Sequence, residues 1–286
     1  MKKVLIAALV FLVSCKSTEY INRFAKSATT GTIEISRASL SFGSICQLYD
    51  PAALARFTDT SLYTAAKRPT VQCIEFRKAD SLTKLINETL VNYFSLLQSV
   101  SDKKLLAYNA TDLVNSLAVI QPQVLPALAL TDEKISAIKV LLNTVLNEPI
   151  KWYRHKKLVT TMKQNDSVLA RVLSAYSFIL DSALSGEISQ AKENYTSFVY
   201  APLYGWSKTP VEKVMINQQY SQFMTSLEVE KDKISKSVRL LSIIRKDHHL
   251  LALGKPPEGF AYTEKEIDQD IVIINKMINE LMLLVK

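Results

Sequence analysis

The chain has 286 residues, which is enough for one or two domains with a substantial hydrophobic core. Its 35 Lys and Arg against 27 Asp and Glu give a formal net charge of +8. The 48% apolar and 22% charged residues are ordinary globular values and exclude bulk disorder. Only 6 residues are glycine, about 2% where about 7% is usual. The composition therefore disfavours folds built on Gly-rich turns or phosphate-binding loops, and it favours helices.

The N-terminus has the layout of a secretory signal. Lys2 and Lys3 precede an apolar run from Val4 to Val13, which is shorter than the roughly 20 residues that a membrane-spanning helix needs. The run ends at Leu12-Val13-Ser14-Cys15. This sequence resembles the lipobox of bacterial lipoproteins, in which a small residue precedes a cysteine that becomes lipidated.

The lipobox resemblance implies a processed and lipid-anchored chain. Residues 1–14 would be removed as a signal peptide, and Cys15 would become the acylated first residue. A doubly or triply acylated cysteine meets the requirement that stable anchoring takes more than one lipid chain. Lys16-Ser17-Thr18-Glu19 lacks both the aspartate of inner-membrane retention in enteric bacteria and the acidic run of surface export in Bacteroidota. We therefore expect the protein to be located in the bacterial cell envelope, at the periplasmic face of the outer membrane.

Two further cysteines, Cys46 and Cys73, remain after lipidation of the first. An oxidising compartment favours a disulfide between them, which stabilises a chain by about 3–4 kcal/mol in the chain-entropy model. The alternative is two free buried thiols, which behave as small hydrophobic side chains.

The mature chain is expected to consist of a tether and one domain. Residues 15–32 are polar and rich in Ser and Thr, which indicates a lipidated tether or the frayed start of a helix. Residues 33–286 are expected to form a single all-α helical bundle domain. Within it, residues 33–48 are interpreted as a helix, and Asp50-Pro51 predicts the capped start of another helix that ends near Lys67.

Aspartates and prolines mark the expected helix boundaries in the middle of the chain. Asp80-Ser81 predicts the start of a third helix, and Asn109 or Thr111 the start of a short one. Thr131-Asp132-Glu133 predicts the cap of a longer helix, because acids suit the positive end of the helix dipole.

Pro149 is expected to kink or divide that longer helix. Asp166 is interpreted as the cap of the next helix, with Gly186 as a possible interruption. Residues 201–209 are expected to form a turn, because Pro202 and Gly205 both disfavour a helix.

The last third of the chain carries two heptad seams. Apolar or aromatic residues fill eight of eleven seam positions between Ile216 and Leu251, and Gly254 with two prolines should end this helix. A capping box at Thr263 then opens a final helix. Its seam consists of Ile267, Ile271, Ile274, Ile278, Leu281 and Val285. The seams predict an elongated bundle with long antiparallel coiled-coil-like helices, although the same faces also allow self-association.

No catalytic, cofactor or metal motif emerges from the sequence. The chain lacks a G-x-S-x-G nucleophile elbow and an H-E-x-x-H zinc motif. His248 and His249 are adjacent, so they do not share a helix face as metal ligands at i and i+4 do. We interpret them as a seam histidine beside a solvated one, and we expect neither a metal nor a cofactor.

Basic residues from 151 to 163 are candidates for contact with an anionic surface. Lys151, Arg154, Lys156 and Lys157 alternate with two aromatic residues, a mixture that suits phosphate head groups or an acidic partner. The alternative is that the aromatic rings pack into the bundle while the cations stay in water. Residues 231–246 leave the same two interpretations open, and an envelope location excludes nucleic acid as the partner.

These features predict a non-enzymatic envelope lipoprotein that serves as a helical scaffold, spacer or docking module for another protein. A second hypothesis is a ligand-binding or sensory bundle that holds an apolar or anionic small molecule between helices. An internal pocket around four aromatic residues would favour this second function. They are Tyr176, Phe178, Phe198 and Tyr204.

Overall fold

The computed structural model describes residues 2–38, 41–43, 45, 69–101, 131–147, 155–253 and 260–285. These residues form an all-α bundle, as the sequence predicts, and the described ranges contain no strand. The elements are α1 (Lys2–Arg37), α5 (Pro69–Ser101), α7 (Asp132–Asn147), α8 (His155–Phe178), η5 (Ile179–Leu184), α9 (Ser185–Tyr195), η6 (Thr196–Tyr200), α10 (Ala201–Trp206), α11 (Pro210–Leu253) and α12 (Phe260–Leu284).

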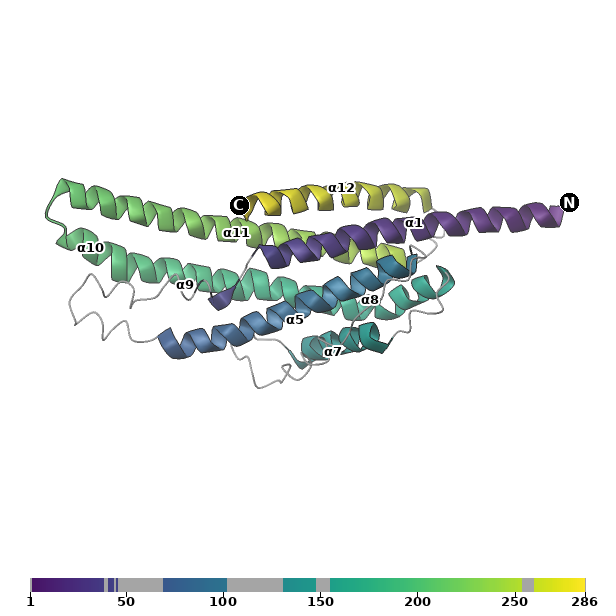
Figure 1. Cartoon of the computed structure of the whole chain (residues 1–286), viewed down its shortest axis with the longest axis horizontal. Coiled ribbons are helices and arrows are strands. Elements are labelled where there is room, and N and C mark those ends of the chain that lie inside the picture. Colours follow the sequence, from purple (N-terminus) through teal and green to yellow (C-terminus); the bar gives the residue numbers. More distant parts are fainter. Residues whose placement is uncertain are drawn as a thin grey trace.

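The long helices run side by side along one axis (Figure 1). Helix α1 packs against α5 and α12, α8 packs against α11, and α7 covers α8. The N-terminal part of α1 projects from one end of the bundle, and the connection between α10 and α11 lies at the opposite end (Figure 1). The bundle is therefore elongated, with its N-terminus and the α10–α11 connection far apart.

Helices α11 and α12 fold back on each other, as their seams predict. Lys246 Nζ lies 2.8 Å from Asp270 Oδ2, and Lys236 Nζ lies 3.6 Å from Glu280 Oε2. The order of these pairs along the two helices makes the arrangement antiparallel. Such partly exposed ion pairs fix the register more than they add to stability, since pairs of this kind contribute about 0–1 kcal/mol each.

The seam residues supply much of the core. In α11 the seam residues from Leu227 through His248 are buried except Glu230, which is half-buried. In α12 the seam is buried from Ile267 through Leu281, whereas Val285 is exposed. A coiled-coil packing of these seams stays a prediction. Large side chains from the other helices complete the core, among them Phe24, Leu90, Phe94, Leu141, Leu173 and Ile179.

Residues 15–32 form part of the core helix α1 and not the predicted tether. Ile21, Phe24 and Ala28 are fully buried. The Thr and Ser side chains that suggested a tether are accommodated inside the helix, because Thr32 Oγ1 donates to the carbonyl of Ala28 at 2.7 Å. A hydroxyl bonded to the preceding turn carries no unsatisfied group into the core. Buried core residues are therefore found at least as early as Ile21, twelve residues before the predicted boundary at residue 33.

Asp80 does not start a helix, since α5 already begins at Pro69. Its carboxylate instead receives the backbone N–H groups of Phe42 and Gly43 at 2.8 and 2.9 Å, and the hydroxyl of Ser41 at 2.8 Å. The predicted capping chemistry is present, but it serves a different segment of the chain. Free N–H groups at a helix start donate to any well-placed carboxylate, whether it belongs to the same segment or to another helix.

Helix α8 continues through two π-helical segments to Trp206, beyond the predicted end near Tyr200. The expected turn at 201–209 is therefore wrong for its first six residues, and only 207–209 lie between helices. The π segment η6 ends two residues before Pro202, a residue that cannot donate a backbone hydrogen bond. Wider π turns change the hydrogen-bond pattern without ending the helix. Gly186 likewise lies inside a continuous helix.

Other predicted boundaries agree or differ by a few residues. Helix α7 begins after Thr131, whose Oγ1 is 3.4 Å from the backbone nitrogen of Lys134, which confirms the predicted cap. Helix α11 ends at Leu253, directly before Gly254, as expected. Helix α12 begins three residues before the capping box predicted at Thr263. The helices predicted after residues 50 and 109, and the kink at residue 149, lie outside the described residues.

Candidate functional site

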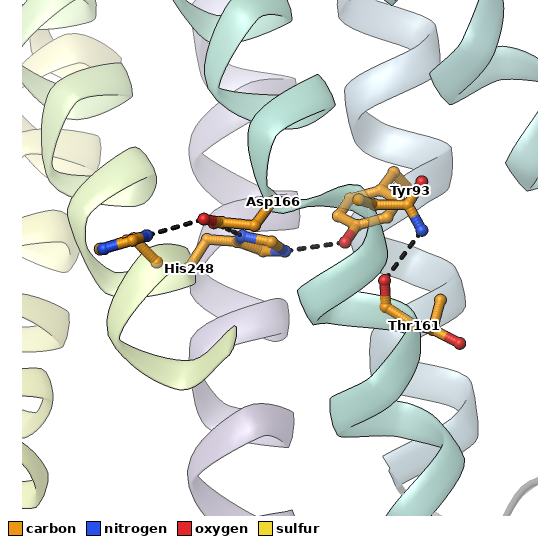
Figure 2. A network of polar contacts seen from close by, with 6 residues as sticks. Tyr93, Thr161, Asp166 and His248 are labelled. Atoms are coloured by element: carbon orange, nitrogen blue, oxygen red, sulfur yellow. Dashed lines mark hydrogen bonds and ion pairs between the residues drawn. The ribbon is translucent and has the colours of Figure 1, made fainter. Parts of the chain in front are cut away.

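A hydrogen-bonded network joins α5, α8 and α11 inside the bundle (Figure 2). The hydroxyl of Tyr93 lies 2.7 Å from Nε2 of His248, and Nδ1 of the same imidazole lies 3.0 Å from Asp166 Oδ1. The other carboxylate oxygen of Asp166 lies 2.7 Å from Nδ1 of His249. One aspartate on α8 thus holds both histidines of α11, and one of them reaches a tyrosine of α5.

Tyr93 and His248 are fully buried, whereas His249 is exposed. This confirms the predicted seam histidine beside a solvated one. Phe24 of α1 packs against the imidazole of His248, with ring centroids 6.4 Å apart. The network is therefore closed to water on its Tyr93 side and open on its His249 side.

Asp166 lies in the middle of α8 and caps no helix, contrary to the prediction from the sequence. Its carboxylate is committed to the histidines, because the register between α8 and α11 places both imidazoles beside it. The neighbouring residue Asn165 extends the polar contacts toward α7. Its amide donates to the carbonyl of Thr161 at 2.8 Å, and its Oδ1 receives the hydroxyl of Thr144 at 3.1 Å.

The electrostatics assign the protons in this network. The hydrogen bond from His248 lowers the pKa of Asp166 to about 2, so Asp166 is a carboxylate at neutral pH. Burial lowers the pKa of His248, which keeps its imidazole neutral. A neutral ring that donates from Nδ1 must accept at Nε2, so Tyr93 is the donor to it. Burial raises the pKa of Tyr93 well above its ordinary value, which keeps that proton on the hydroxyl.

A second buried acid, Asp247, lies next to this network on the face of α11 toward α12. It is fully buried, and neither of its oxygens has a hydrogen-bonding partner among the described residues. Burial, assisted by the negative charge of Asp270, raises its pKa to about 9. Lys246, which pairs with Asp270, does not offset this burial. Asp247 is therefore protonated at neutral pH.

A surface groove runs along the boundary between α11 and the continuous helix formed by α8, η5 and α9. Two adjoining pockets of about 460 and 440 Å³ share Ser242. Small side chains contribute to both pockets, Ala170 to the first and Ser235 to the second. The lining residues are Asp166, Leu169, Ala170, Leu173, Asp181, Ser185, Lys231, Ile234, Ser235, Val238, Arg239, Ser242, Arg245, Lys246, His248 and His249.

The cations of the groove outnumber its acids. Lys246 is held by the acids of α12, and Asp166 is held by the histidines. Arg239 and Arg245 are exposed and make no ion pair with a described residue. Each pocket is also lined by apolar side chains, Leu169, Ala170 and Leu173 in the first and Ile234 and Val238 in the second. The groove can therefore receive an anionic group on the arginines and an apolar group on these side chains.

The structure leaves the predicted site residues untested. Cys15 and Cys73 lie in α1 and α5, but the description does not extend to their side chains, and Cys46 lies outside the described residues. The disulfide therefore stays a prediction.

The same is true of the basic stretch. Lys151 and Arg154 lie outside the described residues. Lys156 and Lys157 belong to the first turn of α8, with side chains that are not described. Their contact with an anionic surface remains an expectation.

The four aromatic residues proposed as a pocket lining do not come together. Tyr176 is in the core, where its hydroxyl donates to Asn87 Oδ1 at 3.3 Å. Phe178 lies beneath the ammonium of Lys134, 4.3 Å from the ring centroid. Phe198 and Tyr204 are exposed. The structure therefore does not supply the aromatic pocket that would have favoured the ligand-binding hypothesis, because the four residues are spread along one long helix from α8 to α10.

Sequence reasoning did not identify the link between Asp166 and the two histidines. One signal for it was available, namely a histidine on an otherwise apolar seam, since a buried imidazole requires a polar partner on a facing helix. The groove arginines gave no comparable signal, because charged residues on a long helix are usually solvated.

By length and composition, one helix of the described part could cross a membrane. It is Leu158–Trp206, and 44% of its apolar window is buried within the bundle. Such burial is also what a core helix shows. Within the described ranges, no group of three or more His, Cys, Asp or Glu side chains could hold a metal ion.

Comparison of the chain with known protein families, curated proteins and solved structures finds no match.

Proposed function

We propose that this chain is a non-enzymatic, lipid-anchored protein of the bacterial cell envelope whose helical bundle serves as a scaffold or docking body. The observation that carries the proposal is the continuity of α1. Cys15 of the lipobox-like sequence lies six residues before Ile21, the first fully buried residue in the part of α1 whose burial is described. At 1.5 Å per residue, about 9 Å of helix would separate the acylated cysteine from the core.

A helical connection of this length would hold the bundle in a defined orientation at the membrane. Further contacts join this part of α1 to α12. Arg23 Nη1 lies 2.7 Å from Asp268 Oδ1, and the hydroxyl of Ser27 lies 3.4 Å from Asn275 Oδ1. Both α1 and α12 would thus connect the anchored end to the rest of the bundle. Such an arrangement suits a spacer or a docking body better than a flexible tether does.

The test is mass spectrometry of the N-terminal peptide from protein isolated from its native host. We expect a mature chain that begins at Cys15 and carries the mass of two or three acyl chains, in the membrane fraction. A Cys15→Ala variant should keep its leader and lose the lipid. An unmodified chain that begins at Met1 would overturn the proposal.

The scaffold role needs a separate measurement. A photo-reactive amino acid at exposed Val272 of α12 should yield one discrete cross-linked partner in intact cells. The same partner should be lost when Cys15→Ala releases the chain from the membrane. Cross-linking that does not depend on the anchor would contradict a docking role at the membrane.

The groove along α11 favours a second candidate function, the binding of an anionic small molecule. Arg245 and Leu173 line one of its pockets, and Arg239 and Val238 line the other. Calorimetric titration with dodecyl phosphate and with inorganic phosphate would test it. Binding should fall at least tenfold in an Arg239→Gln/Arg245→Gln variant and persist in a Lys192→Gln control on α9. No heat from either probe would exclude this function.

A further inference from the structure

The end of the bundle opposite the N-terminus exposes large apolar side chains. Helix α10 ends at Trp206, and α11 begins at Pro210 after a connection of three residues (Figure 1). Four apolar side chains here are each more than half exposed, and together they define the apolar tip. They are Trp206, Val211, Val214 and Met215. Exposed apolar groups that gather at one place commonly mark a binding surface.

The apolar tip is held by a well-formed turn. The Glu212 carboxylate receives the backbone N–H groups of Lys208 and Thr209 at 2.9 and 3.0 Å, and Thr209 Oγ1 receives the N–H of Glu212 at 3.2 Å. These contacts form a reciprocal capping box. The exposed side chains are thus presented by an ordered helix start.

Aromatic rings pack between the two helices next to this turn. Tyr195 lies against Phe223 with ring centroids 3.9 Å apart, and Tyr200 lies against Tyr220 at 4.1 Å. The hydroxyl of Tyr200 donates to Asn217 Oδ1 at 2.9 Å. The α9–η6 segment and α11 are therefore packed against each other next to the tip, whereas the four tip side chains remain exposed.

The charged groups that the tip offers to a partner are mainly positive. Glu212 is the only acid between residues 197 and 227, and its carboxylate is turned toward backbone amides, which lowers its pKa. Lys208 and Lys213 are the cations of the same stretch. The ammonium of Lys213 lies 5.2 Å from the centroid of the Tyr204 ring.

The apolar stripe on α11 is short. Val211 and Met215 are four residues apart, about 6 Å along the helix, and Gln218, Gln219 and Gln222 follow. A partner helix in a groove would need apolar anchors continuing to i+7 and beyond. By contrast, apolar side chains at a membrane surface enter by about 5–10 Å, with Trp and Lys at the level of the head groups.

The geometry points to the apolar tip as a membrane-docking surface that inserts into the head-group region of a bilayer containing anionic phospholipid. Trp206 and the stripe on α11 would enter the lipid, and Lys208 and Lys213 would meet the phosphates. The inference does not depend on acylation at the opposite end. If both hold, the bundle spans from its anchoring membrane to a second bilayer surface.

Fluorescence of Trp206 tests this docking directly. The chain contains two tryptophans, so a Trp152→Phe variant leaves Trp206 as the only tryptophan that can be excited selectively, and Cys15→Ser in the same chain removes acylation. Phosphatidylcholine vesicles with phosphatidylglycerol should shift the emission to shorter wavelength, and brominated lipids should quench it. Vesicles of phosphatidylcholine alone should bind at least tenfold more weakly. A chain held only by its N-terminal end would keep Trp206 in water.

Matched variants locate the effect. Val211→Ser/Val214→Ser/Met215→Ser should weaken vesicle binding at least tenfold, whereas Val272→Ser/Leu283→Ser, at equally exposed positions of α12, should not. Circular dichroism checks that both variants remain folded. Quenching of Trp206 by brominated lipid is measured in the chain whose tip residues are unchanged. This readout therefore does not depend on whether the serine variants fold.

Three outcomes would overturn the docking surface. They are unchanged emission with anionic vesicles, equal loss of binding in the tip and α12 variants, and tip-dependent dimerisation without vesicle binding. The last would assign the tip to contact between two copies of the chain.

Discussion

The hydroxyl of Tyr93 lies 2.7 Å from Nε2 of His248, although 155 positions separate the two residues in the chain. The contact ties α5 to α11 through a fully buried pair. Asp166 holds the opposite side of the same imidazole. A buried network with each partner satisfied favours one helix register over others, since a shifted register would leave these groups unpaired.

We expect Tyr93→Phe to lower the free energy of unfolding by about 1–3 kcal/mol, because it leaves Nε2 of His248 buried without a donor. Urea denaturation at pH 7 measures the effect. Tyr200→Phe removes an exposed hydroxyl that bonds Asn217 and should cost less than about 0.5 kcal/mol. Equal losses in both variants would mean that the buried contact adds nothing specific.

The Asp166 carboxylate predicts a loss of stability in acid. Its pKa is about 2 in the folded chain, below the ordinary value of 3.8. The stabilisation it provides is complete above about pH 4 and disappears as the pH falls toward 2. Because the carboxylate is partly exposed, we expect about 1–2 kcal/mol. The lowered pKa of His248 acts in the same direction, since only the unfolded chain takes up its proton as the pH falls below 6.5.

Urea denaturation between pH 5 and pH 2.5 tests this acid limb. Asp166→Asn should flatten the part below pH 4 and leave the His248 part at least as large, because the lost carboxylate acts to raise the pKa of that histidine. Asp181→Asn, at an exposed position of η5, serves as the control and should keep the full slope. A wild-type chain whose stability is constant over this range would contradict the assignment of Asp166.

Asp247 predicts the opposite dependence on pH. Its pKa is raised to about 9, so the folded chain binds a proton that the unfolded chain releases near pH 4, and stability falls as the pH rises between these values. Asp247→Asn keeps the shape and cannot ionise. We expect it to raise the free energy of unfolding by about 1–3 kcal/mol at pH 8 and by less at pH 5. Asp232→Asn, which removes a partly exposed carboxylate of the same helix, should show no such difference between the two pH values.

Replacing Gly31 and replacing Gly186 by larger residues should have opposite effects on the free energy of unfolding. A Cβ on Gly31 would lie 3.1 Å from Leu240 Cδ2, whereas a Cβ on Gly186 would meet nothing within 4 Å. Gly31→Leu should therefore cost about 1–3 kcal/mol through overpacking between α1 and α11. Gly186→Ala should stabilise by about 0.5–1 kcal/mol, because it restores helix propensity without a clash. Thermal unfolding compares them, and stabilisation by Gly31→Leu would refute close packing of the two helices.

The sequence alone predicted the features that depend on local periodicity. The heptad spacing of Leu227, Ile234 and Leu241 identified the buried face of α11, and Thr131 and Gly254 marked helix ends correctly. These signals are local, because each depends on residues within a turn or two of one helix. The all-α fold followed from them.

Tertiary structure decided what the polar side chains do. Asp80 and Asp166 both have the residue type of a helix cap, yet each lies inside a helix and bonds a group from a distant segment. The Ser and Thr residues of 15–32 suggested a tether but lie in a core helix. A carboxylate or hydroxyl takes whichever donor or acceptor the packing places beside it, and that choice is set by the register between helices. Periodicity within one helix determines its buried face, but not the residues that face it.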